Sequence, residues 1–160
     1  MHRDLKPANI LITRESQTLK LIDFGLAKRI SGADGHTLVR SHTCNVGTPR
    51  YMAPEVLASA RLSSMVEYTE KADIFSAALI IWYLLTGHRP NCRGSEDLRA
   101  RPDLEPARRR WEALAGLLER MWAHEAEARP SAEECVSAMY MMGLCGVGCG
   151  SGFGESCCVQ

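Results

Sequence analysis

The 160 residues are enough for one domain with a hydrophobic core, since folded chains of this length bury roughly 70% of their extended surface. Nineteen Lys and Arg balance nineteen Asp and Glu, which leaves no net charge to attract nucleic acid or an anionic membrane. The longest apolar stretch, 74–85, is too short for a transmembrane segment, and no secretory signal precedes it. We therefore expect a cytoplasmic or nuclear protein without a nucleic-acid partner.

The chain contains seven cysteines, an odd number that no secretory signal accompanies. Disulfide frameworks belong mainly to secreted proteins, so we do not expect one here. Four of the cysteines crowd residues 145–158, but they lack the two pairs at two-residue spacing that are typical of a zinc site. We expect no metal site in this segment.

The first elements are expected to be strands. Two short apolar runs, 9–13 and 19–24, flank a polar stretch and predict a small antiparallel hairpin. Residues 25–50 are rich in Gly, Ser, Thr, His and Asp and show little periodicity. We predict a long irregular loop there, and loops of that length in compact domains are usually functional. Residues 53–59 can form a short helix, because Pro54 is tolerated in a first turn.

The rest of the chain is expected to be helical. A helix from the N-cap residue Thr69 to Gly87 is apolar around nearly its whole circumference, which predicts that it lies at the centre of the domain. Residues 88–106 are expected to be loop with room for one short helix. An amphipathic helix is predicted at 106–122 from apolar residues three and four apart, namely Trp111, Leu114, Leu118 and Met121.

A capping-box pattern marks the start of the last helix. Ser131 and Glu134 follow Pro130 at the required spacing, and the helix is expected to reach about residue 142. Beyond it, residues 143–160 are rich in Gly and Cys and have no core contact to offset their backbone entropy. We therefore predict one domain at 1–142, mainly α with a small β-hairpin, followed by a disordered tail at 143–160.

Three motifs in a fixed order carry the functional signal: HRDLKPAN at 2–9, DFG at 23–25 and GTPRYMAPE at 47–55. Together they resemble the eukaryotic protein kinase family, with a catalytic loop, a metal-binding DFG and an APE segment in series. The resemblance covers residues 2 to about 142. It implies the C-terminal lobe of the protein kinase fold, with ATP and Mg²⁺ as cofactors and a protein as substrate.

The resemblance also implies catalytic roles. Asp4 would accept the proton of the substrate hydroxyl, and Lys6 would steady the γ-phosphate. Asn9 and Asp23 would be the magnesium ligands, both of them oxygen donors. Thr48 would help to position the hydroxyl. Lys6 within HRDLKPAN resembles the serine/threonine version of the loop.

Other positions match supporting parts of the family. Leu11 resembles the apolar floor under the adenine, although an ordinary core leucine in a strand is an equal alternative. Glu55 and Arg129 resemble a buried ion pair that fastens the activation segment to the helical base. Asp73 resembles the aspartate that bonds the backbone of the catalytic loop near Arg3.

Arg3 directly before Asp4 suggests regulation by phosphorylation, because a buried guanidinium there needs an anion. Ser41 and Thr43 are the candidate phosphosites, and Thr37 is a weaker one. The alternative is that these residues are ordinary polar loop residues, since loops favour such residues.

One large part of the family pattern is missing from the 160 residues. They contain no glycine-rich flap, no strand lysine and no helix glutamate upstream of the catalytic loop, so the N-terminal β-rich lobe is absent. We therefore expect a fragment of a serine/threonine kinase that is inactive alone. Its exposed apolar face would need the missing lobe or a partner protein as cover, which predicts poor solubility or association.

Two other interpretations stay open. The chain could serve as a noncatalytic kinase-lobe binding module or a pseudokinase-like scaffold, although such a protein has no physical need for magnesium ligands. The final CCVQ also fits a prenylation motif that would place a farnesyl anchor on Cys157. The sequence does not disclose the protein substrate, the kinase subgroup or the organism.

Overall fold

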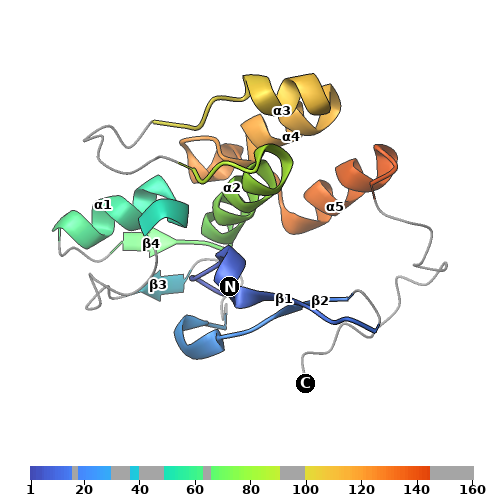
Figure 1. The fold of residues 1–160 in the computed structure, drawn as a ribbon. Helices are drawn as coiled ribbons and strands as arrows, with labels where there is room; N and C mark the ends of the chain where they lie inside the picture. The colour runs from blue at the N-terminus through green and yellow to red at the C-terminus, as the bar shows by residue number, and fades with distance from the viewer. Residues whose placement is uncertain (16–17, 30–36, 40–48, 63–65, 91–99, 145–160) are drawn as a thin grey trace.

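The structure is a computed structural model of the chain, and it describes residues 1–15, 18–29, 37–39, 49–62, 66–90 and 100–144. Most of the regular structure in these residues is helical. The helices gather around α2 (Lys71–Thr86), with α3 (Glu105–Arg110) and α4 (Glu112–Met121) on one side and the strands on the other (Figure 1). No helix in the described ranges is both long and apolar enough to cross a membrane.

Helix α2 is the centre of the hydrophobic core, as its sequence predicts. Ile74, Phe75 and Ile80 lie on different sides of it and are all buried, because apolar side chains surround the helix. The helix starts two residues after Thr69 and ends at Gly87. Gly87 adopts a left-handed conformation with φ 73° and donates its amide to the carbonyl of Tyr83, a helix end that glycine forms without steric penalty.

The helix predicted at 106–122 is two helices. Trp111 separates α3 from α4 with an extended backbone (φ −162°, ψ 92°), and its side chain is exposed. Leu114, Leu118 and Met121 are buried as expected, so the prediction was wrong at the break and at Trp111. Ala107 and Ala115 lie four positions before and after Trp111, and both are fully buried. A core that closes around two alanines leaves little volume for an indole between them.

Helix α5 (Ala132–Met141) begins and ends with hydrogen bonds that the sequence indicated only in part. Ser131 Oγ accepts a hydrogen bond from the Glu134 amide at 3.1 Å, and the Glu134 carboxylate accepts one from the Ser131 amide at 2.6 Å, which confirms the capping box. Gly143 (φ 72°) and Leu144 close the helix through backbone hydrogen bonds to Tyr140 and Met139. The rest of the predicted tail, 145–160, lies outside the described residues.

The first predicted hairpin is present. Strands β1 (Ile10–Ile12) and β2 (Leu19–Leu21) pair antiparallel, with Ile10 opposite Leu21 and Ile12 opposite Leu19. The hairpin is exposed on much of its surface: Ile12 and Leu19 are 66% and 65% accessible. Its role is to bring the residue before β1, Asn9, next to the residues that follow β2.

A second strand pair corrects the prediction of an irregular loop at 25–50. β3 (Thr37–Val39) pairs antiparallel with β4 (Val66–Tyr68), which lies between α1 (Pro54–Leu62) and α2. Its two strands are far apart in the sequence, and a three-residue strand has too little periodicity to reveal a distant partner. Helix α1 itself was predicted, although it extends beyond 59. In the predicted loop at 88–106, residues 91–99 lie outside the described part, and 100–104 form no helix.

Candidate active site

The catalytic loop is attached to the start of helix α2 by one carboxylate. Asp73, in the first turn of α2, accepts hydrogen bonds from the backbone amides of His2 (2.6 Å) and Arg3 (2.9 Å). Hydrogen bonds to a charged acceptor are shorter and stronger than neutral ones. Arg3 adopts a positive φ of 70°, a conformation that costs energy for a residue with a side chain. Asp73 therefore holds the loop in a conformation that it would rarely adopt alone.

Asp4 lies in this loop with two polar side chains against it. Lys6 Nζ is 2.5 Å from Asp4 Oδ2, and the Asn9 amide nitrogen donates to the Asp4 carbonyl at 2.9 Å and to Oδ2 at 3.2 Å. Asn9 is buried, and the Asp4 side chain is nearly so. The carboxylate is thus fixed in orientation and has a cation beside it. A group held in this way can accept a proton from a hydroxyl that is placed against it.

Asp23 reaches the same region through the hairpin. The amide of Ile22 donates to the carbonyl of Asn9 at 3.0 Å, so the residues that follow β2 lie next to Asn9. The His2 imidazole fixes the same segment, since its Nε2 is 3.0 Å from the Ile22 carbonyl and its ring is 5.0 Å from that of Phe24. Asp23 adopts a left-handed conformation (φ 62°) that non-glycine residues rarely occupy.

The donor atoms around Asp23 are of the kind that magnesium prefers. Asn9 donates its amide nitrogen to Asp4, which leaves its amide oxygen as the atom available to a cation. A carboxylate and an amide oxygen suit Mg²⁺, which usually takes one or two protein carboxylates and completes its shell with water and phosphate. No cluster of three or more His, Cys, Asp or Glu side chains with metal-binding geometry occurs among the described residues. The two kinds of oxygen donor at Asn9 and Asp23 fit the ligand preference of Mg²⁺.

The structure describes some of the remaining predicted site residues and leaves others outside its described ranges. Leu11 is 50% exposed in β1, so the alternative of an ordinary core leucine is wrong. Arg3 donates its Nε to the Leu26 carbonyl at 2.5 Å, a contact that ties the catalytic loop to the segment after the DFG motif. Three predicted residues lie outside the described part of the chain: the positioning residue Thr48 and the phosphosites Ser41 and Thr43.

A bidentate ion pair joins the APE segment to the start of α5. Arg129 Nη1 and Nη2 lie 2.7 and 2.8 Å from the two oxygens of Glu55, and the Arg129 side chain is fully buried. The same guanidinium donates to three backbone carbonyls, those of Lys71, Ala123 and His124. Sequence reasoning missed the return contact, in which Lys71 Nζ donates to the Arg129 carbonyl at 2.6 Å. No local sequence pattern indicates this contact, because its two residues are 58 positions apart.

The third motif is also packed into the core. Tyr51 is buried, and its carbonyl accepts a hydrogen bond from Ser76 Oγ at 2.7 Å. Burial raises the pKa of the Tyr51 hydroxyl above its ordinary value. The first and third motifs therefore contact α2 directly, and the DFG motif contacts the first motif through Phe24 and His2.

Comparison with known proteins identifies the family of the chain. The model of the protein kinase domain matches residues 1–141, nearly all of the chain. The chain belongs to the protein kinase family. The serine/threonine-protein kinase STY46 of Arabidopsis thaliana is 35% identical over 147 residues, which cover 87% of this chain and 23% of that protein.

The names of other kinase relatives state different specificities for the amino acid that is phosphorylated. The dual specificity protein kinase shkC of Dictyostelium discoideum is 30% identical over 87% of this chain and 27% of its own length. The seven transmembrane domain-containing tyrosine-protein kinase 1 of the same organism is 34% identical over 82% of this chain and 18% of its own length. The chain thus spans about a quarter or less of these three relatives.

Proposed function

We propose that the chain is the C-terminal lobe of a serine/threonine protein kinase, which transfers the γ-phosphate of ATP to a protein hydroxyl. The observation that supports this most is the position of Asp4: its carboxylate is oriented by Asn9 and Lys6 on a loop that Asp73 holds. A noncatalytic surface has no need for a carboxylate fixed in this way.

The proposed chemistry assigns one task to each side chain. Asp4 accepts the proton as the substrate oxygen attacks the γ-phosphorus, and the bond from phosphorus to the bridging oxygen of ADP breaks. Lys6 sits beside Asp4 and balances negative charge on the transferred group. Asn9 and Asp23 would hold Mg²⁺, which neutralises phosphate charge when bound. The preference for serine and threonine rests on Lys6 in HRDLKPAN, because the names of the relatives include all three specificities.

The hairpin surface supports the assignment to one half of a nucleotide cleft. Leu11, Leu21 and Phe24 are large apolar side chains that are half exposed beside the catalytic loop. In the proposed function Leu11 contacts the adenine, and the surrounding apolar surface is covered by an N-terminal lobe or by a partner protein. Since the 160 residues contain no glycine flap or strand lysine, we expect them to transfer phosphate at close to the uncatalysed rate when tested alone.

The same exposed surface also favours a second candidate, a noncatalytic binding module. In that case the hairpin would bind a partner, and the carboxylate of Asp4 would be dispensable. The two candidates differ in whether removal of a single charge abolishes phosphate transfer.

The test is an isosteric substitution of the proposed base. The assay uses the protein expressed from the complete reading frame that contains these 160 residues. It measures the incorporation of labelled phosphate from Mg-ATP into casein. We expect Asp4→Asn to lower kcat about 10²- to 10⁴-fold, because an amide cannot accept the proton, and to lower the melting temperature only slightly through the lost ion pair with Lys6. Glu133→Gln, an exposed carboxylate-to-amide change on α5, is the control and should retain full activity. Transfer by Asp4→Asn at the wild-type rate would exclude the proposed role.

A further inference from the structure

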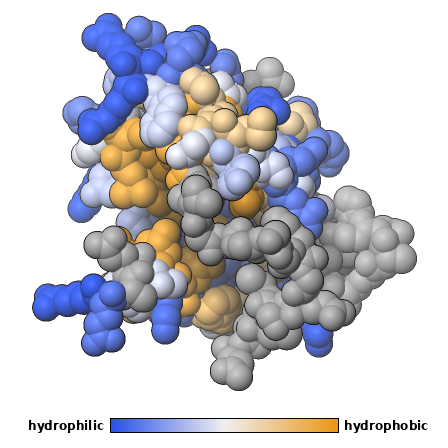
Figure 2. Space-filling view, turned by 90° about the vertical axis from the view of Figure 1, so that its right-hand side faces the viewer, coloured by the Kyte–Doolittle hydropathy of each residue, from blue (hydrophilic) through white to orange (hydrophobic). Residues whose placement is uncertain are grey.

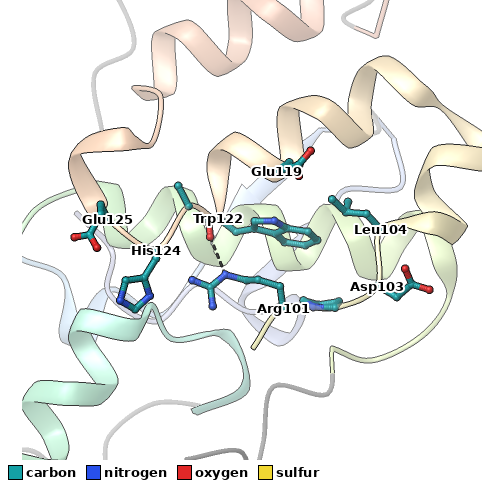
Figure 3. A pocket seen from close by; sticks show the side chains of 9 residues that line it. Arg101, Asp103, Leu104, Glu119, Trp122, His124 and Glu125 are labelled. Carbon is teal, nitrogen blue, oxygen red and sulfur yellow. Dashed lines mark hydrogen bonds between the residues drawn. The ribbon is translucent and has the colours of Figure 1, made fainter. Parts of the chain in front are cut away.

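A pocket of about 580 Å³ lies away from the catalytic loop, between the segment that precedes α3 and the turn that follows α4 (Figure 3). Its lining comes from residues 101–104 and 119–125, and none of the three kinase motifs contributes to it. Volumes of 300 to 1,000 Å³ are common for binding pockets. The pocket is therefore a separate candidate site on the same domain.

The base of the pocket is apolar. The indole of Trp122 is buried beneath it, and Leu104 and Pro102 are half-buried at its side. Figure 3 shows Leu104 and the indole facing the same space. This surface can take an aliphatic side chain or the methylene stem of a long one.

The rim of the pocket is acidic. Asp103, Glu119 and Glu125 line it, and all three are exposed. Glu119 Oε2 forms an ion pair with Arg108 Nη2 at 3.0 Å, but Arg108 is not part of the lining. Glu125 precedes a short 3-10 helix and makes no capping hydrogen bond to it, so that helix does not use the carboxylate.

The one cation in the lining, Arg101, is turned toward the protein. Its Nε donates to the Trp122 carbonyl at 2.8 Å, its Nη1 donates to the Ala100 carbonyl, and its guanidinium lies 4.8 Å from the centre of the Phe75 ring. The rim therefore presents carboxylate charge, of which Glu119 is paired with Arg108 and Asp103 Oδ1 accepts a hydrogen bond from the Glu105 amide at 3.0 Å. Among the described residues, the lining also contains a buried polar atom without a hydrogen-bond partner, Nδ1 of His124.

We propose that this pocket binds a basic peptide segment of a protein partner. Basic side chains of the segment pair with the separate carboxylates of Asp103, Glu119 and Glu125, which Figure 3 shows on different sides of the pocket, and a neighbouring apolar side chain packs on Leu104 and Trp122. Charge complementarity selects against nucleic acid and acidic peptides, and the apolar base selects against small hydrophilic cations. Recruitment of a substrate through this segment rests on the proposed kinase function, whereas the binding itself does not.

The test measures binding without ATP or magnesium, so that it is independent of catalysis. A fluorescein-labelled decapeptide that contains Leu-Lys-Arg-Leu is titrated with the full chain, and its anisotropy is compared with that of the Leu-Glu-Glu-Leu peptide. We expect only the basic peptide to bind, and Glu125→Lys to weaken its affinity by roughly fivefold or more at about 0.15 M salt, where the Debye length is only about 8 Å. Glu127→Lys makes the same charge change two residues away, outside the lining, and should leave the affinity within about twofold.

Further variants separate this proposal from the others. Asp4→Asn should bind the basic peptide as the wild type does, because Asp4 does not line the pocket. If Glu125→Lys does not fold, Glu125→Gln serves instead, with a smaller expected loss. Equal binding of both peptides, absence of binding, or equal weakening by the substitutions at 125 and 127 would overturn the proposed docking site.

Discussion

Arg129 shows how one residue can join distant segments. Its buried guanidinium bonds both oxygens of Glu55 and three backbone carbonyls, so it connects α1, the start of α2 and the turn before α5. Phe75 adds a cation–π contact at 5.1 Å. The two partners differ in exposure, because the Arg129 side chain is fully buried and that of Glu55 is 20% exposed.

This difference predicts an asymmetric effect of mutation. Arg129→Met should lower the free energy of unfolding by about 3 to 5 kcal/mol, because it leaves the Glu55 carboxylate and three carbonyls without their donor. Glu55→Gln should cost less, since its amide oxygen still accepts one hydrogen bond and water reaches the site. Urea denaturation of both variants measures the two values. An equal loss, or a larger loss for Glu55→Gln, would contradict this account.

At the scale of single elements, helix α5 carries a charge-dependent cap. The pKa of Glu134 is held below its ordinary value of 4.5, chiefly by the hydrogen bond from the Ser131 amide to its carboxylate. A carboxyl whose pKa is lower in the folded state stabilises the fold in its ionised form. That contribution is complete above the unfolded pKa and is lost as the pH falls through the folded one.

The cap therefore predicts how stability responds to acid. Glu134→Gln should lose less stability than the wild type as the pH is lowered from about 5, because glutamine cannot be protonated there. Glu133→Gln, a change at the neighbouring exposed carboxylate, should keep the pH dependence of the wild type. Urea unfolding at pH 7, 5 and 4 compares the three proteins. Identical curves for Glu134→Gln and the wild type would show that the cap does not contribute.

At the scale of the whole molecule, exposed apolar surface is the main feature. Figure 2 shows apolar surface on the side where α5 and the far end of the hairpin lie. The hairpin contributes four large exposed side chains, Leu11, Ile12, Leu19 and Leu21, and the segment after it adds Ile22 and Phe24. Ile12, Leu19 and Leu21 share one face of the hairpin, and exposed apolar side chains gathered on one face usually mark a surface that contacts another protein or segment.

We predict that the hairpin drives association of the 160-residue chain in solution. Leu19→Lys places a charge on the cross-strand pair with Ile12, where both side chains are open to water, and should raise the monomer fraction in sedimentation experiments. Leu84→Lys is the control, because Leu84 is 72% exposed on α2 rather than on the hairpin. A monomeric wild-type chain, or an equal effect of both substitutions, would contradict the prediction.

The sequence alone determined the elements whose signals are local. The β1–β2 hairpin, the buried helix α2 with its stop at Gly87, and the Ser131–Glu134 cap all depend on residues within a few positions of one another. The three motifs identified the family for the same reason, because each is a short run with fixed spacing. Roles of single residues such as Asp4 and Asn9 came from that resemblance and stay predictions.

Only the tertiary structure decided the features that depend on distant contacts. The pairing of β3 with β4, the break at Trp111 and the contact of Lys71 with the Arg129 carbonyl have no local pattern. The pocket beside Trp122 likewise needs two segments about 20 residues apart. Local propensity acts over a few residues, whereas packing volume and hydrogen-bond partners are set by whichever segments the fold brings together.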